Sequence, residues 1–162
     1  MHNAVKRYIE KVKERYPKHF ENAEILEFGS MYFNGSPREF FRCCVYTGVD
    51  HNDGHCVDVV CKAHEFKSDK KFKTIITTEM LEHDKYAELS IKNALSLLEE
   101  DGILIITAAG VDREKHFDFV GEDDWYKNIS KSDIEKWCKG YKIEIEDTKL
   151  DIRALIKKWR HT

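Results

Sequence analysis

The segment 103–109, which reads ILIITAA, constrains the fold more than any other part of the sequence. A strand that faces water on one side alternates polar and apolar residues, whereas a strand buried on both faces is apolar throughout. The segment follows a helical stripe of Ile91, Ala94, Leu95 and Leu98, and the residues EDG at 100–102 are expected to end that helix. A helix that leads into a doubly buried strand predicts a parallel sheet covered by helices.

The rest of the chain alternates in the same way. Three further apolar segments are typical of strands: 23–28, 45–50 and 73–80. The first helix is predicted by apolar residues at helical spacing that stop before Pro17: Val5, Tyr8, Ile9, Val12 and Tyr16. A second helix is expected at 37–44, where Ser36 can cap it and Pro37 is its first residue.

A last helix and a hairpin complete the pattern. Ser132 and Glu135 form a candidate capping box, and Gly140 stops the helix that they begin. The segments 141–147 and 151–159 alternate polar and apolar residues and predict an antiparallel hairpin at the edge of the sheet. The expected fold is therefore α/β: a Rossmann-like, doubly wound and mostly parallel sheet that ends in an antiparallel hairpin, with helices on both faces.

Length and composition set the frame for this fold. The 162 residues, 41% of them hydrophobic, suffice for one core, so a single domain over 1–162 is expected, with the helix at 1–17 as a candidate lid. With 27 basic against 30 acidic residues, the chain lacks the positive excess of a non-specific nucleic-acid binder, and nucleic acid is not the expected partner. Nothing in the composition indicates an oligomeric state.

The expected location is cytoplasmic. No apolar run approaches the roughly 18 residues that a membrane span requires, and the charged segment after Met1 does not resemble a secretory signal. The five cysteines, an odd number, favour free thiols in a reducing compartment over a disulfide framework.

In sheets of this class, ligands bind at the carboxyl ends of the strands. The predicted strands place Glu27 and Gly29, Asp50 and Glu79 at those ends, so three carboxylates are expected to converge on one crevice. A binding site that is rich in carboxylates attracts a positively charged ligand and repels a phosphate.

The loop after the first strand, EFGSMYFNGS at 27–36, distinguishes between two possible cofactors. A dinucleotide needs glycines that let the backbone approach its pyrophosphate, and Met31 and Phe33 stand where two of them would be. S-adenosylmethionine has no phosphate, carries a sulfonium and an ammonium group, and offers two ribose hydroxyls. Asp50, twenty-one residues after Gly29, is placed to accept hydrogen bonds from those hydroxyls.

Four motifs in order resemble the class I methyltransferases that use S-adenosylmethionine, in particular the small bacterial and phage proteins of the type 11 family. They read EFGSMYFNGS, YTGVDHNDGHCVDVVCKAHEF, TIITTEMLEHD and LLEEDGILIITAAG, and the resemblance covers about residues 23–155. It implies a Rossmann-like domain that binds S-adenosylmethionine and transfers its methyl group.

Carried onto this sequence, the resemblance implies a set of cofactor-binding residues: Glu27, Gly29, Ser30 and Met31 for the methionine part, Asp50 for the ribose, His51, Lys62, Ala63 and His64 around the adenine, and Glu79 and Met80 along the crevice. Lys62 departs from the family, which usually has an acidic residue there to accept from the adenine amino group. A lysine side chain has no acceptor.

The same reasoning offers Glu79 and His83 as catalytic residues, since a base is needed where a hydroxyl or ammonium acceptor must lose a proton. Trp125 and Tyr126 are either a substrate lid or the apolar underside of a loop. The acceptor expected is a small molecule or a glycan-like group. Methylation of protein or nucleic acid, and a non-catalytic module that only binds S-adenosylmethionine, stay open as alternatives.

No metal site is expected. His51, His55, Cys56 and Cys61 lie close in sequence, but they lack the paired spacing of zinc ligands, and two of them fall in the predicted ribose loop.

Overall fold

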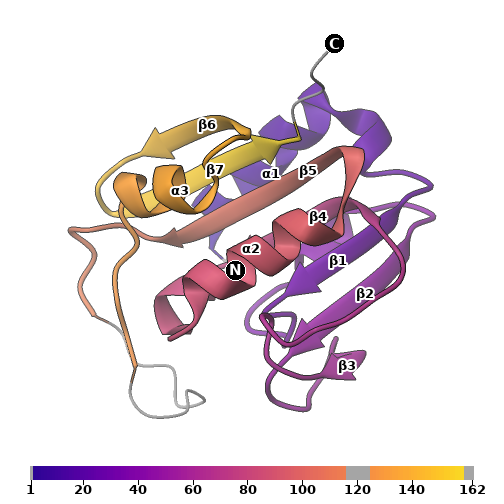
Figure 1. Cartoon of the computed structure of the whole chain (residues 1–162), viewed down its shortest axis with the longest axis horizontal. Helices are drawn as coiled ribbons and strands as arrows, with labels where there is room; N and C mark the ends of the chain where they lie inside the picture. Colours follow the sequence, from indigo (N-terminus) through magenta and orange to yellow (C-terminus); the bar gives the residue numbers. More distant parts are fainter. Residues whose placement is uncertain (1, 116–124, 159–162) are drawn as a thin grey trace.

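The structure is a computed structural model, and it describes residues 2–115 and 125–158. One seven-stranded sheet runs through it in the order β3-β2-β1-β4-β5-β7-β6 (Figure 1). The first five of these strands are parallel, and β7 is antiparallel to both β5 and β6. The strands are β1 Glu24–Phe28, β2 Val45–Asp50, β3 Val59–Val60, β4 Phe72–Thr78, β5 Leu98–Ala109, β6 Lys142–Asp147 and β7 Asp151–Lys157.

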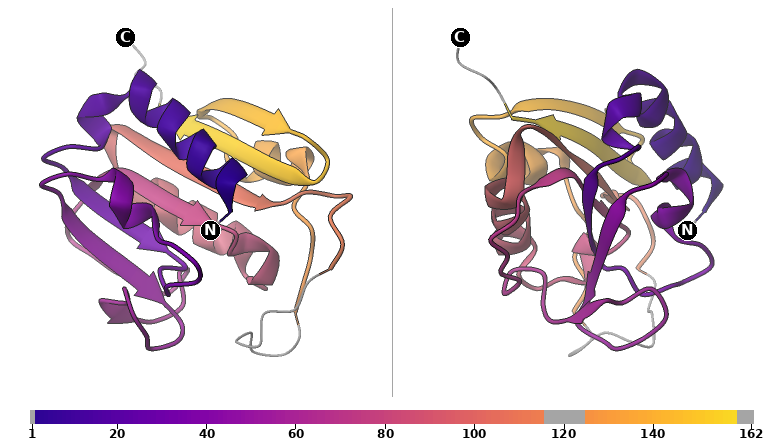
Figure 2. Two further views of the ribbon diagram at one scale, coloured as in Figure 1. Left: turned by 180° about the vertical axis from the view of Figure 1, so that it is seen from behind. Right: turned by 90° about the vertical axis from the view of Figure 1, so that its right-hand side faces the viewer.

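Helices cover both faces of this sheet, which confirms the predicted fold class. Helix α1 (Asn3–Arg15) lies on one face, and α2 (Ala87–Leu97) and α3 (Lys131–Trp137) lie on the other (Figures 1 and 2). Strand β5 serves both layers because successive side chains point to opposite faces. Its Ile103 and Ile105 belong to the core under α1, and Leu104 and Ile106 belong to the core under α2 and α3.

Helix α1 is part of the packed core over most of its length. Val5, Tyr8, Ile9 and Val12 are buried against the sheet. Only its amino end reaches the carboxyl ends of the strands, where His2 precedes the first turn. In the described residues, no helix is long and apolar enough to cross a membrane.

The expected helix at 37–44 was wrong. Only a short 3-10 helix, η2, forms at Pro37–Phe40, with the Arg38 N–H donating to the hydroxyl of Ser36 (3.2 Å). The ring of Phe41 stacks on Phe20, with centroids 4.7 Å apart, and the backbone of Phe41 itself is extended. Packing of Phe41 therefore overrides a local sequence that favours a helix.

Two boundaries also differ from the sequence prediction. The capping box of α3 is formed by Ser130 and Asp133, so the predicted cap at Ser132 was two residues late. Strand β5 begins at Leu98, immediately after α2 and before the EDG segment that was expected to end the helix. The two-residue edge strand β3 was not predicted.

Candidate functional site

A cavity opens where β1, β2 and β4 end. It has two adjoining parts, a larger hollow of about 640 Å³ and a smaller one of about 130 Å³. Both are lined by Gly29, Asp50, His51, Met80 and His83. The larger hollow also contains Glu27, Met31 and Glu79, and the smaller one Lys62, Ala63 and Trp125. The structure thus places the three strand-end carboxylates in one cavity.

Three residues of the sequence prediction lie beside the cavity and not in its wall. Ser30 is buried under the loop, and its N–H donates to the Val49 carbonyl (3.2 Å). The His64 ring packs on Tyr86, with centroids 4.4 Å apart, and the Tyr126 ring packs edge-on against His83 at 5.2 Å. These residues can support the wall but do not form it.

Gly29 is required where it stands. Its φ of +78° is a left-handed conformation that side chains disfavour, and a Cβ there would lie 2.6 Å from Cγ of Met80. Its N–H donates to the Val49 carbonyl at 2.9 Å. Glycine therefore allows the loop to turn while Met80 packs against its backbone.

The bulky residues that follow have two different roles. Met31 and Phe33 line the larger hollow. Met31 also lies close to Gly54, since a Cβ added at Gly54 would lie 3.0 Å from Sδ of Met31. Tyr32 holds the loop in place: its N–H donates to the His55 carbonyl (3.0 Å), and its ring lies 5.4 Å from the His55 ring. The loop supplies an apolar wall and its own anchor.

Glu27 is a buried acid at the floor of the larger hollow, with 2% of its surface exposed. Burial raises the pKa of Glu27 to about 7, although the Tyr46 hydroxyl, which donates to its Oε2 at 2.8 Å, acts in the opposite direction. The carboxyl group is therefore about half ionised at neutral pH, and a cation bound beside it would favour the ionised form.

Asp50 joins the two parts of the cavity and shapes the loops around it. Its Oδ2 accepts from the Met31 N–H (3.1 Å) and its Oδ1 from the Asn52 N–H (3.0 Å). The carboxylate remains in the wall of both hollows. Because it fixes two loops, a change at Asp50 alters the shape of the site as well as its charge.

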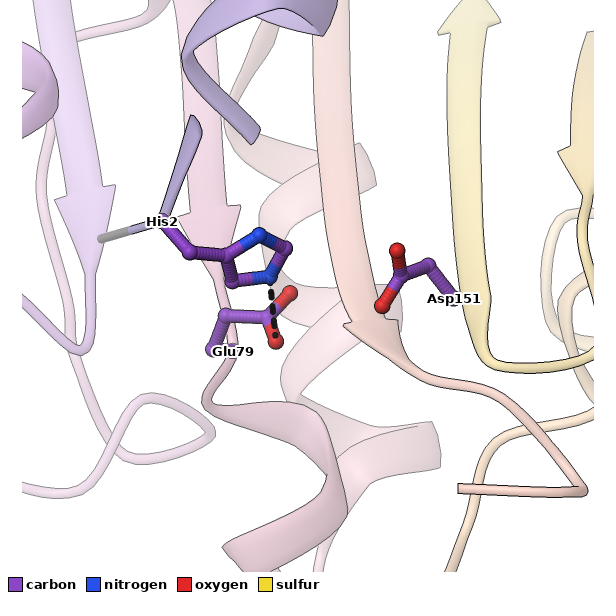
Figure 3. Close-up of side chains that lie close together, drawn as sticks. All are labelled: His2, Glu79 and Asp151. Carbon is purple, nitrogen blue, oxygen red and sulfur yellow. Dashed lines mark ion pairs between the residues drawn. The ribbon is translucent and has the colours of Figure 1, made fainter. Parts of the chain in front are cut away.

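Glu79 lies at the centre of a charged cluster that the sequence pattern did not predict (Figure 3). The Arg113 Nη1 donates to its Oε2 at 2.7 Å, His2 Nε2 lies 3.5 Å from the same oxygen, and Arg113 Nη2 lies 2.9 Å from Oδ1 of Asp151. Burial raises the pKa of Glu79, but His2, Thr107 and Arg113 together lower it by more, so that it lies below its ordinary value. Glu79 is therefore a carboxylate at neutral pH and a weak proton acceptor.

The same cluster has the spacing of a metal site. Ligand atoms of His2, Glu79 and Asp151 lie within 4.8 Å of one another, and Figure 3 shows the Asp151 carboxylate facing the other two from β7. The guanidinium of Arg113 contacts both carboxylates, so one positive charge faces two negative ones. Among the described residues, the sequence neighbours His51, His55, Cys56 and Cys61 do not form such a group.

Glu82 connects this cluster to the segment after the β5 loop. It is fully buried, its Oε1 accepts from the Ala109 N–H (3.1 Å), and its carbonyl accepts from the Lys127 N–H (2.9 Å). Burial and the nearby Glu79 charge raise the pKa of Glu82 to about 8. It thus holds the segment with Trp125 and Tyr126 beside the cavity.

No family model matches the chain. It is 35% identical over 65 residues to N-methyltransferase 4 of Papaver somniferum, covering 39% of this chain and 18% of that protein. It is 24% identical over 104 residues to (S)-coclaurine N-methyltransferase of the same plant, covering 54% of this chain and 30% of that protein. The chain therefore spans less than a third of the length of these curated relatives.

The structural likeness is more extensive. The Burkholderia thailandensis 1,6-didemethyltoxoflavin-N1-methyltransferase, with bound S-adenosylhomocysteine, superimposes with a TM-score of 0.70 and 13% identity, over 95% of this chain and 78% of that one. N-methyltransferase NodS of Bradyrhizobium japonicum WM9, also bound to S-adenosylhomocysteine, gives 0.69 and 12%, over 96% and 87%. The chain has the fold of the class I methyltransferases, and the narrower type 11 assignment stays a prediction.

Proposed function

We propose that the protein is a methyltransferase that uses S-adenosylmethionine and acts on a small molecule. One observation carries the proposal: within a methyltransferase fold, Glu27, Asp50 and Glu79 line a single cavity at the carboxyl ends of β1, β2 and β4. The relatives support it, since two structural neighbours were crystallised with S-adenosylhomocysteine and the curated relatives are N-methyltransferases.

The cavity offers complementary groups for each part of the cofactor. Glu27 faces the larger hollow and suits the ammonium of the methionine part. Asp50, between the hollows, suits the ribose hydroxyls. The smaller hollow, with Lys62 and Ala63, suits the adenine, and His64 supports it through Tyr86. Lys62 cannot accept from the adenine amino group, so binding there depends on packing and backbone groups.

S-adenosylmethionine supplies a methyl group that is already activated by the sulfonium. The remaining tasks of the protein are to align an acceptor behind the methyl group and to exclude water. Imidazole is the side chain suited to proton exchange near neutral pH, and His83 and His2 both line the larger hollow. Glu79, with its lowered pKa, is better suited to orient these groups than to take a proton itself.

The decisive experiment is a calorimetric titration with S-adenosylhomocysteine and, separately, with NAD. We expect micromolar binding of the first and none of the second. Asp50→Asn should weaken the first by about tenfold or more, because a charged acceptor of hydrogen bonds is lost. Asp69→Asn, at an exposed position outside the cavity, is the control. A folded protein that does not bind S-adenosylhomocysteine would exclude the proposal.

A second candidate, a binding module without catalysis, is motivated by Lys62. It predicts S-adenosylhomocysteine binding without methyl transfer to any small molecule, protein or nucleic acid offered. A cytoplasmic location is also part of the proposal, because the five cysteines are free.

A further inference from the structure

The larger hollow extends beyond the region that the cofactor would use. Its outer end is bounded by His2, from the residue before α1, by Glu79 at the end of β4, and by Arg113 and Glu114 after β5. None of these four residues lines the smaller hollow that suits the adenine. The outer end therefore lies on the side of the cavity away from the adenine part, where an acceptor has to enter.

The charge of the hollow is strongly one-sided. Among the described residues that line it, Glu27, Asp50, Glu79 and Glu114 carry carboxyl groups, and Arg113 is the only lysine or arginine. The two terminal nitrogens of Arg113 are already directed at Glu79 and Asp151, at 2.7 and 2.9 Å. An anionic acceptor would meet carboxylates and a committed guanidinium, whereas a cation would meet favourable charge.

The same hollow also has an apolar lining. Met31, Phe33 and Pro37 line the same hollow, and the Phe33 ring is half exposed. An aromatic ring and carboxylates in one hollow are a combination that attracts an organic ammonium group, through the ring and through charge together. A metal ion or another inorganic cation would not be stabilised by contact with these apolar side chains.

We propose that the outer end, bounded by His2, Glu79, Arg113 and Glu114, binds the methyl acceptor together with the apolar residues of the same hollow, and that this acceptor is a primary or secondary amine on an apolar body. The inference rests on the proposed function and deepens it. The amine enters as an ammonium paired with Glu79, beside His2, whose Nε2 lies 3.5 Å from that carboxylate, and loses one proton to water. Its lone pair then forms the N–C bond while the C–S electron pair stays on sulfur.

The test uses ligands matched in shape and different in charge, titrated into protein saturated with S-adenosylhomocysteine. One set is 2-phenylethylamine, 2-phenylethanol and 3-phenylpropanoate, and the other is cyclohexylmethylamine, cyclohexylmethanol and cyclohexylacetate. In at least one set the amine should bind about tenfold more tightly than the alcohol, about 1.4 kcal/mol, with the acid weakest. Added salt should reduce the difference.

Variants assign the preference to the outer end. Glu79→Gln should bring the amine and the alcohol to within about twofold of each other. Glu144→Gln, which removes a carboxylate on β6 that pairs with Arg15 and Lys157, should leave the preference intact. If Glu79→Gln does not fold, Glu114→Gln at an exposed position replaces it and should reduce the preference in part.

The outcomes separate this inference from the proposed function. Binding of S-adenosylhomocysteine with no preference for amines, a preference for the acid, or no detectable amine binding at millimolar concentration would overturn the inference alone. An unchanged preference in Glu79→Gln would also overturn it. Failure to bind S-adenosylhomocysteine would remove the proposed function, and the ligand sets would then be titrated into the protein without it.

Discussion

The buried acid Glu27 makes cofactor binding depend on pH in a way that can be calculated. Its pKa of about 7 means that about a tenth of the free protein carries an ionised Glu27 at about pH 6 and about nine tenths at about pH 8. If the ammonium of the cofactor binds only beside the ionised form, the affinity should rise about tenfold over this range, or about 1.4 kcal/mol. Binding should also release about 0.9 protons at about pH 6 and about 0.1 at about pH 8.

The assay is calorimetric titration with S-adenosylhomocysteine in buffers of different ionisation enthalpy, which yields both the affinity and the number of protons released. Glu27→Gln should bind more weakly at pH 8 and lose the pH dependence. Tyr46→Phe removes the hydrogen bond that lowers the pKa of Glu27, so the midpoint should move to higher pH. An affinity that is constant from pH 6 to pH 8, or a pH dependence that survives in Glu27→Gln, would refute the reasoning.

Three further predictions concern single residues. Lys62→Asp should tighten S-adenosylhomocysteine binding several-fold in a calorimetric titration, because a carboxylate can accept from the adenine amino group and lysine cannot; weaker binding would show that the residue does not face the adenine. Gly29→Ala should weaken that binding and lower the free energy of unfolding by about 1–3 kcal/mol, because its Cβ meets Met80 at a positive φ. The control is Gly140→Ala, which has a φ of +94° but nothing within 4 Å of the added Cβ, so it should show the backbone strain alone and leave binding unchanged. For Glu82, the folded-state pKa of about 8 is raised above the unfolded value, so its contribution to stability is complete below about pH 4.3 and is lost as the pH rises through about 8. The free energy of unfolding of Glu82→Gln minus that of the wild type, measured by chemical denaturation, should therefore be at least about 1 kcal/mol larger at about pH 9 than at about pH 5. An equal difference at the two pH values would contradict the assignment.

The sheet was predictable because its signals are local. The doubly buried part of β5, residues 103–109, has to be almost entirely apolar, and the hairpin of β6 and β7 has to alternate. The region at 37–44 was not predictable in the same way, because Ser36 and Pro37 do begin a helical turn, and only the packing of Phe41 on Phe20 ends it. That contact joins residues far apart in the sequence.

The residues of the candidate site also fall into two groups, those that a local pattern predicts and those that only the fold brings together. Glu27, Asp50 and Glu79 were found because each lies at or directly after the end of a strand that the sequence predicts. His2 and Arg113 were missed although both contact Glu79, because they are separated from each other by 111 residues and no spacing links them. The protonation of the acids was also out of reach, since it depends on burial and on partners such as Tyr46 that only the fold supplies.

The bulky loop after β1 is explained by the missing helix. Where a helix was expected after the loop, the chain forms only the short η2, whose Pro37 is its one residue in the lining of the larger hollow. Met31, Phe33 and Pro37 form the wall instead, and Tyr32 fastens the loop to His55. A glycine at position 31 or 33 would contribute no side chain to that wall, and the carboxylates of the hollow would then face water, where a cation is attracted far less strongly. The residues that depart from a dinucleotide fingerprint are thus the ones that enclose the proposed site for a positively charged ligand.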